Sequence, residues 1–127
     1  KFKILLKEIL FMKIKYSTMI TENMEETVKF YNETLRFEIE STFDLPNNAK
    51  ITLLKGEGET LIEVIQNNID KVGLYSIGIE VTDLNKTVAN LKEKGVKFLL
   101  EPTEISVGSM ARFQDPNGVN IVLLQHY

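Results

Sequence analysis

Residues 16–35, with the sequence YSTMITENMEETVKFYNETL, have a counterpart 60 positions further on, residues 76–95, with the sequence SIGIEVTDLNKTVANLKEKG. Threonine, valine and glutamate recur at matching positions, and Met24 corresponds in character to Leu84. Each copy is patterned as a short strand, a capped helix and then further strands. The repeat therefore predicts a chain built from two similar modules.

In the first copy, residues 14–20 are predicted to form a strand. Asn23, with Glu26 three residues later, forms a predicted capping box at the start of a helix. Four apolar side chains follow near the helical period: Met24, Val28, Tyr31 and Leu35. Three more strands are predicted at residues 36–42, 49–55 and 60–66, and the segment Asp44-Leu-Pro-Asn-Asn48 is a loop.

The last two of these strands should form a hairpin across Gly56-Glu-Gly-Glu59. A glycine-rich segment of this kind also suggests phosphate binding. It does not open a helix, however, and its two glutamates would repel an anion. We interpret it as a turn.

In the second copy, residues 74–81 are the opening strand and Asp83 caps the helix. The apolar face of that helix is Leu84, Val88 and Leu91, and Gly95 fits the position just after its end. Residues 97–100 are then predicted as a strand and 101–109 as a loop around Pro102 and Gly108. A closing hairpin of residues 110–114 and 119–125 turns at Asp115-Pro-Asn-Gly118.

Composition excludes several kinds of chemistry. The 127 residues contain no cysteine and one histidine, so disulfides, thiolate catalysis and a multi-histidine metal centre are ruled out. The net charge of −3, with no long basic run, argues against a nucleic-acid partner. No apolar stretch approaches the roughly 18 residues of a membrane span, so no membrane partner and a cytoplasmic location are expected.

Residues 1–11 stand apart from the repeat. Phe2, Leu5, Leu6 and Ile9 fall on one helical face. An amphipathic helix packed on the body and a disordered leader both fit this pattern. A third hypothesis is that Met12 is the natural start and the segment is a non-native leader, since Lys7-Glu8 can be encoded by a ribosome-binding sequence. The domain itself is predicted to span residues 12–127, with modules at 12–66 and 74–125.

Three segments carry a resemblance to a known family: MEETVKFYNETLRFE at residues 24–38, SIGIEVTDL at 76–84 and FQDPNGVNIVLL at 113–124. They resemble the glyoxalase/bleomycin-resistance/dioxygenase family, also called the vicinal oxygen chelate superfamily, over residues 12–125. The resemblance implies an α+β fold in which two βαβββ modules form a cupped mixed sheet, usually paired in a homodimer. Family members include metal-dependent lyases, isomerases and dioxygenases, and metal-free proteins that sequester drugs.

The same resemblance locates the family's four metal ligands on the first and fourth strands of each module. They fall on Tyr16 and Ser76, where histidine is usual, on Glu63, which keeps the carboxylate, and on Val122, which replaces glutamate. A divalent cation needs several oxygen or imidazole donors. We therefore expect no metal and no other cofactor, although a cation completed by substrate oxygens stays open. Arg36 stands where the family usually has glycine, which suggests a helix end without a left-handed cap.

Strand alternation sorts the remaining candidates. Glu63 should point into the cup, while Ile62 and Val64 pack under the helices; a carboxyl group between aliphatic neighbours could act as an acid or base. Arg112 shares the cup face if Phe113 is in the core, and its guanidinium could hold a carboxylate or phosphate.

Each of these candidates also has a plain structural interpretation. Glu63 could lie exposed at the mouth of the cup or pair with a cation, and Arg112 could form a salt bridge with it or be solvated. Tyr16 is a candidate for stacking on a ligand or for a hydrogen bond to it, and Phe43 is a candidate for lining the entrance of the pocket. Both could instead be ordinary packed residues. His126, at the C-terminus, is expected to be exposed, which argues against a catalytic triad with Ser76.

Three functions follow from this pattern. The first is a glyoxalase-like protein that binds a small organic ligand in a metal-free cup. The alternative is a lyase- or isomerase-type enzyme that uses Glu63 as an acid or base, with or without a divalent metal. A regulatory subunit with a vestigial pocket is the third.

Overall fold

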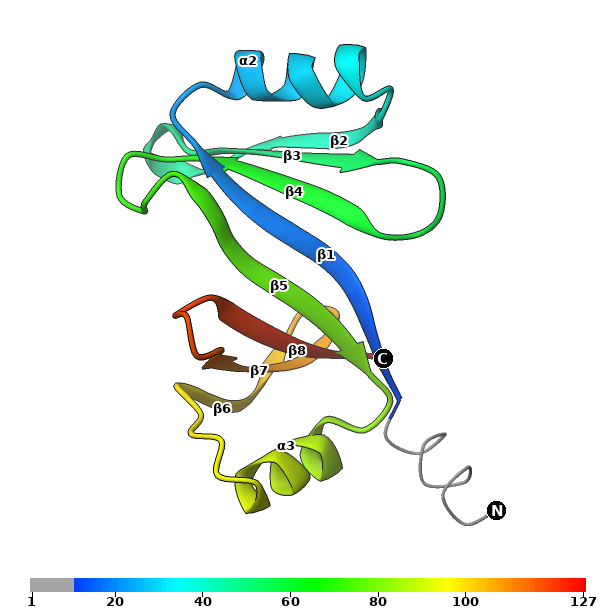
Figure 1. Cartoon of the computed structure of the whole chain (residues 1–127), viewed down its shortest axis with the longest axis vertical. Helices are drawn as coiled ribbons and strands as arrows, with labels where there is room; N and C mark the ends of the chain where they lie inside the picture. The colour runs from blue at the N-terminus through cyan, green and yellow to red at the C-terminus, as the bar shows by residue number, and fades with distance from the viewer. Residues whose placement is uncertain (1–10) are drawn as a thin grey trace. The chain divides into compact units, whose positions relative to one another are not determined.

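The computed structural model describes residues 11–127, which form a mixed sheet of eight strands with two short helices (Figure 1). Residues 1–10, which hold nearly all of the predicted extension, lie outside this range. The elements in chain order are β1 (Met12–Thr21), α2 (Met24–Lys29), a π-helical turn (Phe30–Thr34), β2 (Glu38–Asp44), a 3-10 turn (Pro46–Asn48), β3 (Lys50–Lys55), β4 (Leu61–Gln66), β5 (Gly73–Val81), α3 (Leu84–Glu93), β6 (Leu100–Ile105), β7 (Gly108–Gln114) and β8 (Asn120–His126).

The chain divides into two compact units. The N-terminal unit is Lys15–Ser76, and the C-terminal unit contains Ile77–Tyr127 together with the described residues 11–14. Strands β2, β3, β4 and β1 are hydrogen-bonded in that order, as are β5, β8, β7 and β6. β1 runs parallel to β4, whereas β2–β3, β3–β4, β6–β7 and β7–β8 are antiparallel. The α+β class is thereby confirmed, while the predicted cup, which would need both units, stays a prediction.

The two helices begin alike, as the repeat predicts. The side chain of Asn23 accepts a hydrogen bond from the backbone N–H of Glu26 at 3.0 Å, and the side chain of Asp83 accepts one from Lys86 at the same distance. Each bond satisfies a backbone donor that a helix start leaves without a partner. The N-caps predicted from sequence are therefore confirmed. The reciprocal half of the predicted capping box is not formed, because the backbone N–H of Asn23 donates to Thr21 Oγ1 at 3.0 Å instead of to the Glu26 side chain.

A glutamine at the end of β4 and another near the end of β8 support these helix starts. Gln66 Oε1 accepts from the backbone N–H of Met24 at 2.6 Å, and Gln125 Oε1 accepts from that of Leu84 at 2.7 Å. A side chain 41 or 42 residues away thus ties each helix to the last strand of its own βαβββ repeat. The two copies share this contact as well as their sequence pattern.

The helix ends differ. After α3, Gly95 has φ 93° and donates its N–H to Lys92, while Val96 donates to Leu91. These are the two hydrogen bonds of a Schellman motif with glycine in the left-handed position. The predicted role of Gly95 is confirmed.

The predicted absence of a left-handed cap at Arg36 is wrong. Arg36 itself has φ 67°, and the following Phe37 donates its N–H to Tyr31 O at 2.9 Å. The Asn32 side chain donates to Phe37 O at 2.6 Å, and the Phe37 ring packs on Tyr31 and on the core. These contacts offset the steric cost of about 1–2 kcal/mol that a side chain meets in this conformation.

Replacing Arg36 by glycine should therefore stabilise the protein. Glycine removes the strain of the Cβ atom, which stabilises the folded state. This gain is partly cancelled because glycine has greater conformational freedom in the unfolded chain, which costs about 0.5–1 kcal/mol on folding. We expect a gain of about 0.5–1 kcal/mol in the free energy of unfolding, measured by urea denaturation at pH 7. Arg36→Ala is the matched control, because it removes the guanidinium and keeps the Cβ; an equal gain in both variants would assign the effect to charge.

Each unit has its own hydrophobic core. In the N-terminal unit, Leu54 and Val64 are fully buried beneath α2 with Met24. In the C-terminal unit the cluster beneath α3 is larger: Val81, Leu84, Val88, Ala111, Ile121 and Leu123, with Phe98 and Phe113 packed against it. The predicted orientations of Val64, Ile62 and Phe113 toward the helices are confirmed.

The helical period predicted for the first helix fails at its end. The helix changes from α to π geometry at Phe30, so Leu35 is 45% exposed instead of following Met24, Val28 and Tyr31 into the core. A π turn holds more residues than an α turn and shifts the positions that come after it.

The strand predicted at residues 97–100 and the loop at 101–109 are also wrong. The strand is β6, it includes Pro102, and it pairs with β7 through a register shift between Leu100 and Thr103. Proline is tolerated here because β6 is the last strand in the order and the shift removes the need for a regular ladder.

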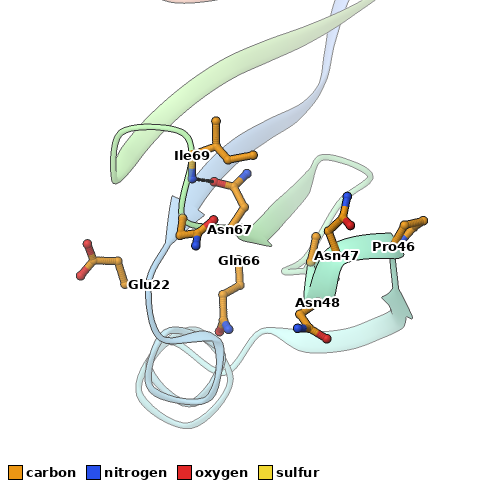
Figure 2. Close-up of a pocket in the computed structure, with 9 residues that line it drawn as sticks. Glu22, Pro46, Asn47, Asn48, Gln66, Asn67 and Ile69 are labelled. Atoms are coloured by element: carbon orange, nitrogen blue, oxygen red, sulfur yellow. Dashed lines mark hydrogen bonds between the residues drawn. The ribbon is translucent and has the colours of Figure 1, made fainter.

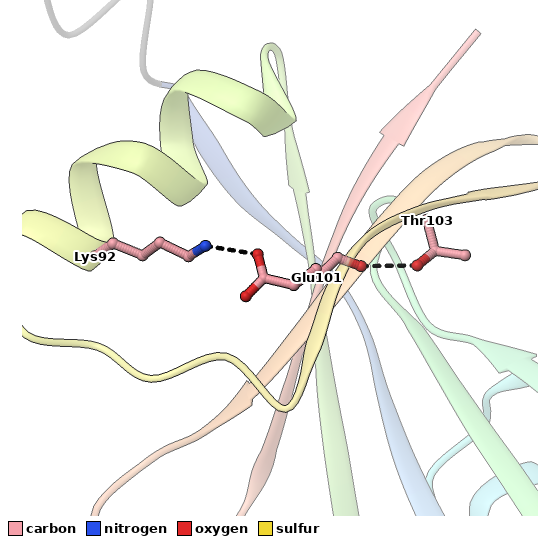
Figure 3. Close-up of polar contacts among 3 residues, drawn as sticks. All are labelled: Lys92, Glu101 and Thr103. Atoms are coloured by element: carbon pink, nitrogen blue, oxygen red, sulfur yellow. Dashed lines mark hydrogen bonds and ion pairs between the residues drawn. The ribbon is translucent and has the colours of Figure 1, made fainter.

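One ion pair links α3 to β6 (Figure 3). Lys92 Nζ lies 2.6 Å from Glu101 Oε1, and Thr103 donates a hydroxyl hydrogen bond to Glu101 O at 2.7 Å. Both charged side chains are about half exposed, so the pair contributes little to stability.

Among residues 11–127, no helix is long and apolar enough to cross a bilayer.

Candidate functional site

The parallel pairing of β1 with β4 brings two polar side chains of the N-terminal unit together. Thr18 lies opposite Glu63, and the Thr18 hydroxyl donates a hydrogen bond to Glu63 Oε1 at 2.7 Å. Thr18 is 2% exposed, so the hydroxyl has a fixed environment. The carboxylate of Glu63 is thus held by a neutral donor on the neighbouring strand.

Tyr16 lies two residues before Thr18, on the same face of β1. Burial, and then the negative charge of Glu63, raise the pKa of Tyr16 from 10.0 to about 12. The phenol therefore keeps its proton throughout the physiological range. It can donate a hydrogen bond, but it is not available as a phenolate.

This shift predicts a pH dependence above pH 10. Because the folded-state pKa is higher than the unfolded value, the contribution of Tyr16 to stability is complete below pH 10 and is lost as the pH rises through about 12. Absorbance titration should show a tyrosinate step near pH 12, and Tyr16→Phe should remove that step.

The same variant provides the stability test. Tyr16→Phe should lose less stability than the wild type between pH 10 and 12. Tyr75→Phe, on the 37% exposed Tyr75, is the control that leaves the late step in place. A late step that survives in Tyr16→Phe would contradict the assignment.

Phe43 and Ser76 complete the candidates in the N-terminal unit. Phe43 pairs with Ile51, which pairs with Ile65, so it belongs to the sheet face of Glu63. It is 50% exposed on the edge strand β2, and contact with a ligand and ordinary packing both stay open for it. Ser76, on β5, is 4% exposed.

Arg112 and Val122 lie opposite each other on β7 and β8 in the C-terminal unit. Arg112 donates from Nη1 to Asn120 Oδ1 at 2.8 Å, and Val122 is 8% exposed. Ala111, next to Arg112, is fully buried in the core beneath α3, so Arg112 occupies the opposite face as predicted. Convergence of this pair with Tyr16, Glu63 and Ser76 remains a prediction.

His126 is exposed, as predicted, but it has a partner. Its Nδ1 lies 2.6 Å from Glu80 Oε2 on β5. The pair lines a hollow of about 280 Å³ with Phe11, Val81, Thr82 and Gln125. Ser76 belongs to the other unit, so the absence of a catalytic triad of Ser76 and His126 stays a prediction.

Tyr16 and Ser76 occupy matching positions in the two modules, and so do Glu63 and Val122. Gln66 and Gln125, which make the same contact in each copy, follow Glu63 and Val122 by three residues. The two N-caps likewise follow Tyr16 and Ser76 by seven residues. The substitutions therefore stand at matching places of the two modules.

These residues do not fit the divalent ion of the family's metal enzymes. Glu63 supplies one carboxylate, Tyr16 stays a phenol, Ser76 offers a neutral hydroxyl and Val122 offers no donor. Among residues 11–127 no group of three or more His, Cys, Asp or Glu side chains gathers as a metal site.

A separate hollow of about 460 Å³ lies at one end of the N-terminal unit (Figure 2). Its walls are rich in side-chain amides, and Asn67 Oδ1 accepts from the backbone N–H of Ile69 at 3.1 Å. None of the six candidate residues lines it. The amide residues are Asn47, Asn48, Gln66, Asn67 and Asn68.

Sequence reasoning missed Thr18. Strand alternation places Thr18 on the face of Tyr16, which was a usable signal. Its position opposite Glu63 depends on the β1–β4 register, and a parallel pair of strands so far apart in sequence has no local signal for its register.

The chain belongs to the Glyoxalase/Bleomycin resistance protein/Dioxygenase superfamily, whose family model matches residues 13–123. A relative from Arabidopsis thaliana, "Probable lactoylglutathione lyase, chloroplastic", is 32% identical over 114 residues, which is 81% of this chain and 33% of the relative. The chain thus spans about a third of that protein. "Uncharacterized protein YurT" from Bacillus subtilis is 28% identical over 90% of this chain and 99% of its own length.

Solved structures share the fold. The hypothetical protein BH1468 from Bacillus halodurans has a TM-score of 0.76 at 20% identity, over 91% of this chain and 95% of that one. A methylmalonyl-CoA epimerase from Mycobacterium tuberculosis has a TM-score of 0.72 at 14% identity, over 90% and 87%. At these identities the likeness concerns the fold and not the reaction.

Proposed function

We propose that this member of the superfamily binds a small organic molecule on the sheet face that carries Tyr16 and Glu63, without a metal ion. The observation that carries the proposal is the donor set: Glu63 is the single strong ligand at the four equivalent positions, and a threonine hydroxyl already occupies one of its oxygens. Phe43, Ser76, Arg112 and Val122 are the further proposed contacts.

The face around Glu63 has the composition of a ligand site. Cross-strand pairing places Leu61, Ile65, Ile51 and Leu53 on it, with few polar groups among them. An apolar surface with a small number of fixed polar groups is typical of sites for small organic ligands. Tyr16 adds an aromatic ring that keeps its hydroxyl proton.

Thermal unfolding of the full chain tests the proposal, because a ligand stabilises the state it binds. After treatment with EDTA, near-stoichiometric nickel, zinc, manganese or iron should leave the Tm of the wild type unchanged. Members of a panel of aromatic and peptide-like compounds should raise it. Metal-induced stabilisation that is lost in Glu63→Gln would overturn the metal-free proposal, and no response to any organic compound would favour a vestigial pocket.

A second candidate is an enzyme in which Glu63 takes or gives a proton. The observation in its favour is that a carboxylate and a neutral phenol lie on one sheet face, near enough for the charge of Glu63 to act on Tyr16, since one can remove a proton while the other stabilises a developing oxyanion. Two similar proteins are named a lactoylglutathione lyase and an epimerase, which are the reaction classes to assay first. Undiminished turnover by Glu63→Gln would exclude this role.

We also propose that the protein forms a homodimer. We propose no nucleic acid and no membrane as a partner. Light scattering coupled to size exclusion should give twice the mass of one chain. A monomer at micromolar concentration would contradict it.

A further inference from the structure

Within Lys15–Ser76, the carboxylate of Glu63 has hydrogen-bonding capacity beyond its bond with Thr18. A carboxylate accepts at about four positions, and the structure assigns one of them to the Thr18 hydroxyl. Within Lys15–Ser76 no lysine or arginine forms an ion pair with it. Lys55, which shares the sheet face, lies 3.8 Å from Glu40 instead.

The surroundings of this anion are apolar. Glu63 lies directly opposite Leu53 on β3, and its neighbours along β4 on the same face are Leu61 and Ile65. A cation bound against the carboxylate at such a place excludes water from the ion pair, and the attraction is then stronger than it would be in bulk solvent. A neutral ligand has no equivalent gain.

Two aromatic rings share the face with Glu63. Tyr16 is close enough for the Glu63 charge to act on its hydroxyl, and Phe43 lies half exposed on the edge strand. Aromatic faces attract ammonium groups. The N-terminal unit also carries six basic and eleven acidic residues, a net charge of −5, so its field favours the approach of a cation.

We infer that the ligand of this site is a protonated amine attached to an apolar body, with its ammonium group on the free acceptor positions of Glu63. This inference rests on the proposed function and names its ligand class. Binding to the carboxylate requires an N–H donor. A primary ammonium compound should therefore bind better than the trimethylammonium compound with the same apolar group. The trimethylammonium group carries a positive charge that can interact with the aromatic rings, but it cannot donate a hydrogen bond to the carboxylate.

Matched probes separate charge from shape. Titrations of the full-length chain, followed by amide NMR spectra, would use 2-phenylethylamine, its neutral counterpart 2-phenylethanol, and the trimethylammonium derivative of the amine. We expect the wild type to bind the primary amine at least about tenfold more tightly than the alcohol, with the largest shifts in β1 and β4. The trimethylammonium probe should fall between them.

Variants locate the charge. Glu63→Gln keeps the size of the side chain and should reduce the preference for the amine to less than about twofold. Glu57→Gln, on the exposed β3–β4 turn, removes one negative charge at a different place and should retain the preference for the amine. The amide NMR spectrum of free Glu63→Gln, with the dispersion of the wild-type spectrum, is the check that this variant is folded.

The outcomes distinguish the two proposals. Equal binding of amine and alcohol at β1 and β4 would overturn the inference and leave the binding function in place. A preference for the amine that persists in Glu63→Gln would overturn the inference as well. Failure of all three probes to bind at millimolar concentration would overturn it together with the proposed function for ligands of this class.

Discussion

Replacement of Gly108 by alanine should lower the free energy of unfolding by at least about 3 kcal/mol. Gly108 begins β7 with φ 154°, in register with His126 at the end of β8. A Cβ at this position would lie 1.9 Å from the backbone O of Gln125 and 2.9 Å from the Cα of His126. Since both atoms belong to the paired backbone, the strands would have to separate. Urea denaturation at pH 7 measures the loss.

Gly58→Ala is the matched control. Gly58 also has a positive φ, 94°, but no atom lies within 4 Å of the added Cβ. It should lose about 1–2 kcal/mol from backbone strain alone. If the two variants lose the same amount, the clash contributes nothing, and the close approach of β7 to β8 at Gly108 would be contradicted.

The parts of the fold that were predictable from the sequence depend on neighbouring residues. The N-caps at Asn23 and Asp83 and the glycine end of α3 each need only a few residues, whose chemistry is specific to those positions. The alternation along β4 likewise assigned Val64 to the core and Glu63 to the opposite face. Such features hold wherever the global fold agrees with the local preference.

The errors come from competition between distant contacts and local preference. Arg36 adopts a left-handed conformation because Phe37 is anchored by Tyr31 and Asn32, so the packing of a neighbour decides its backbone. β6 includes Pro102 because an edge strand tolerates a missing donor. Neither outcome is encoded within a short window of sequence.

The candidate site likewise has features that the sequence predicts and features that depend on the fold. Residue identity alone revealed that Tyr16, Ser76 and Val122 are poor metal ligands, because this follows from their side-chain chemistry. The contact of Thr18 with Glu63 and the raised pKa of Tyr16 depend on the register of two strands that are 45 residues apart. Sequence could therefore indicate which metal-binding donors these positions lack, and only the fold could show what surrounds the remaining carboxylate.

Truncation of a core leucine in each unit should have effects of similar kind and different size. Leu54 and Leu123 are 0% and 1% exposed, and Leu→Ala at such sites costs about 2–5 kcal/mol. The cost depends on how far the surroundings collapse into the cavity. Leu123 belongs to a cluster of six buried residues beneath the ten-residue α3, whereas Leu54 lies with two others beneath the six-residue α2.

We therefore expect Leu123→Ala to cost about 4 kcal/mol and Leu54→Ala about 3 kcal/mol, because the short α2 can shift toward the space left beneath it. Residues of α2, β2 and β3 also line a hollow of about 500 Å³, which leaves that helix room to shift. Urea denaturation measures both values, and Leu99→Ala, at a 58% exposed position, is the control with an expected loss below about 1 kcal/mol. A larger loss at Leu54 than at Leu123 would show that the smaller core is the more tightly constrained one and would contradict this account of α2.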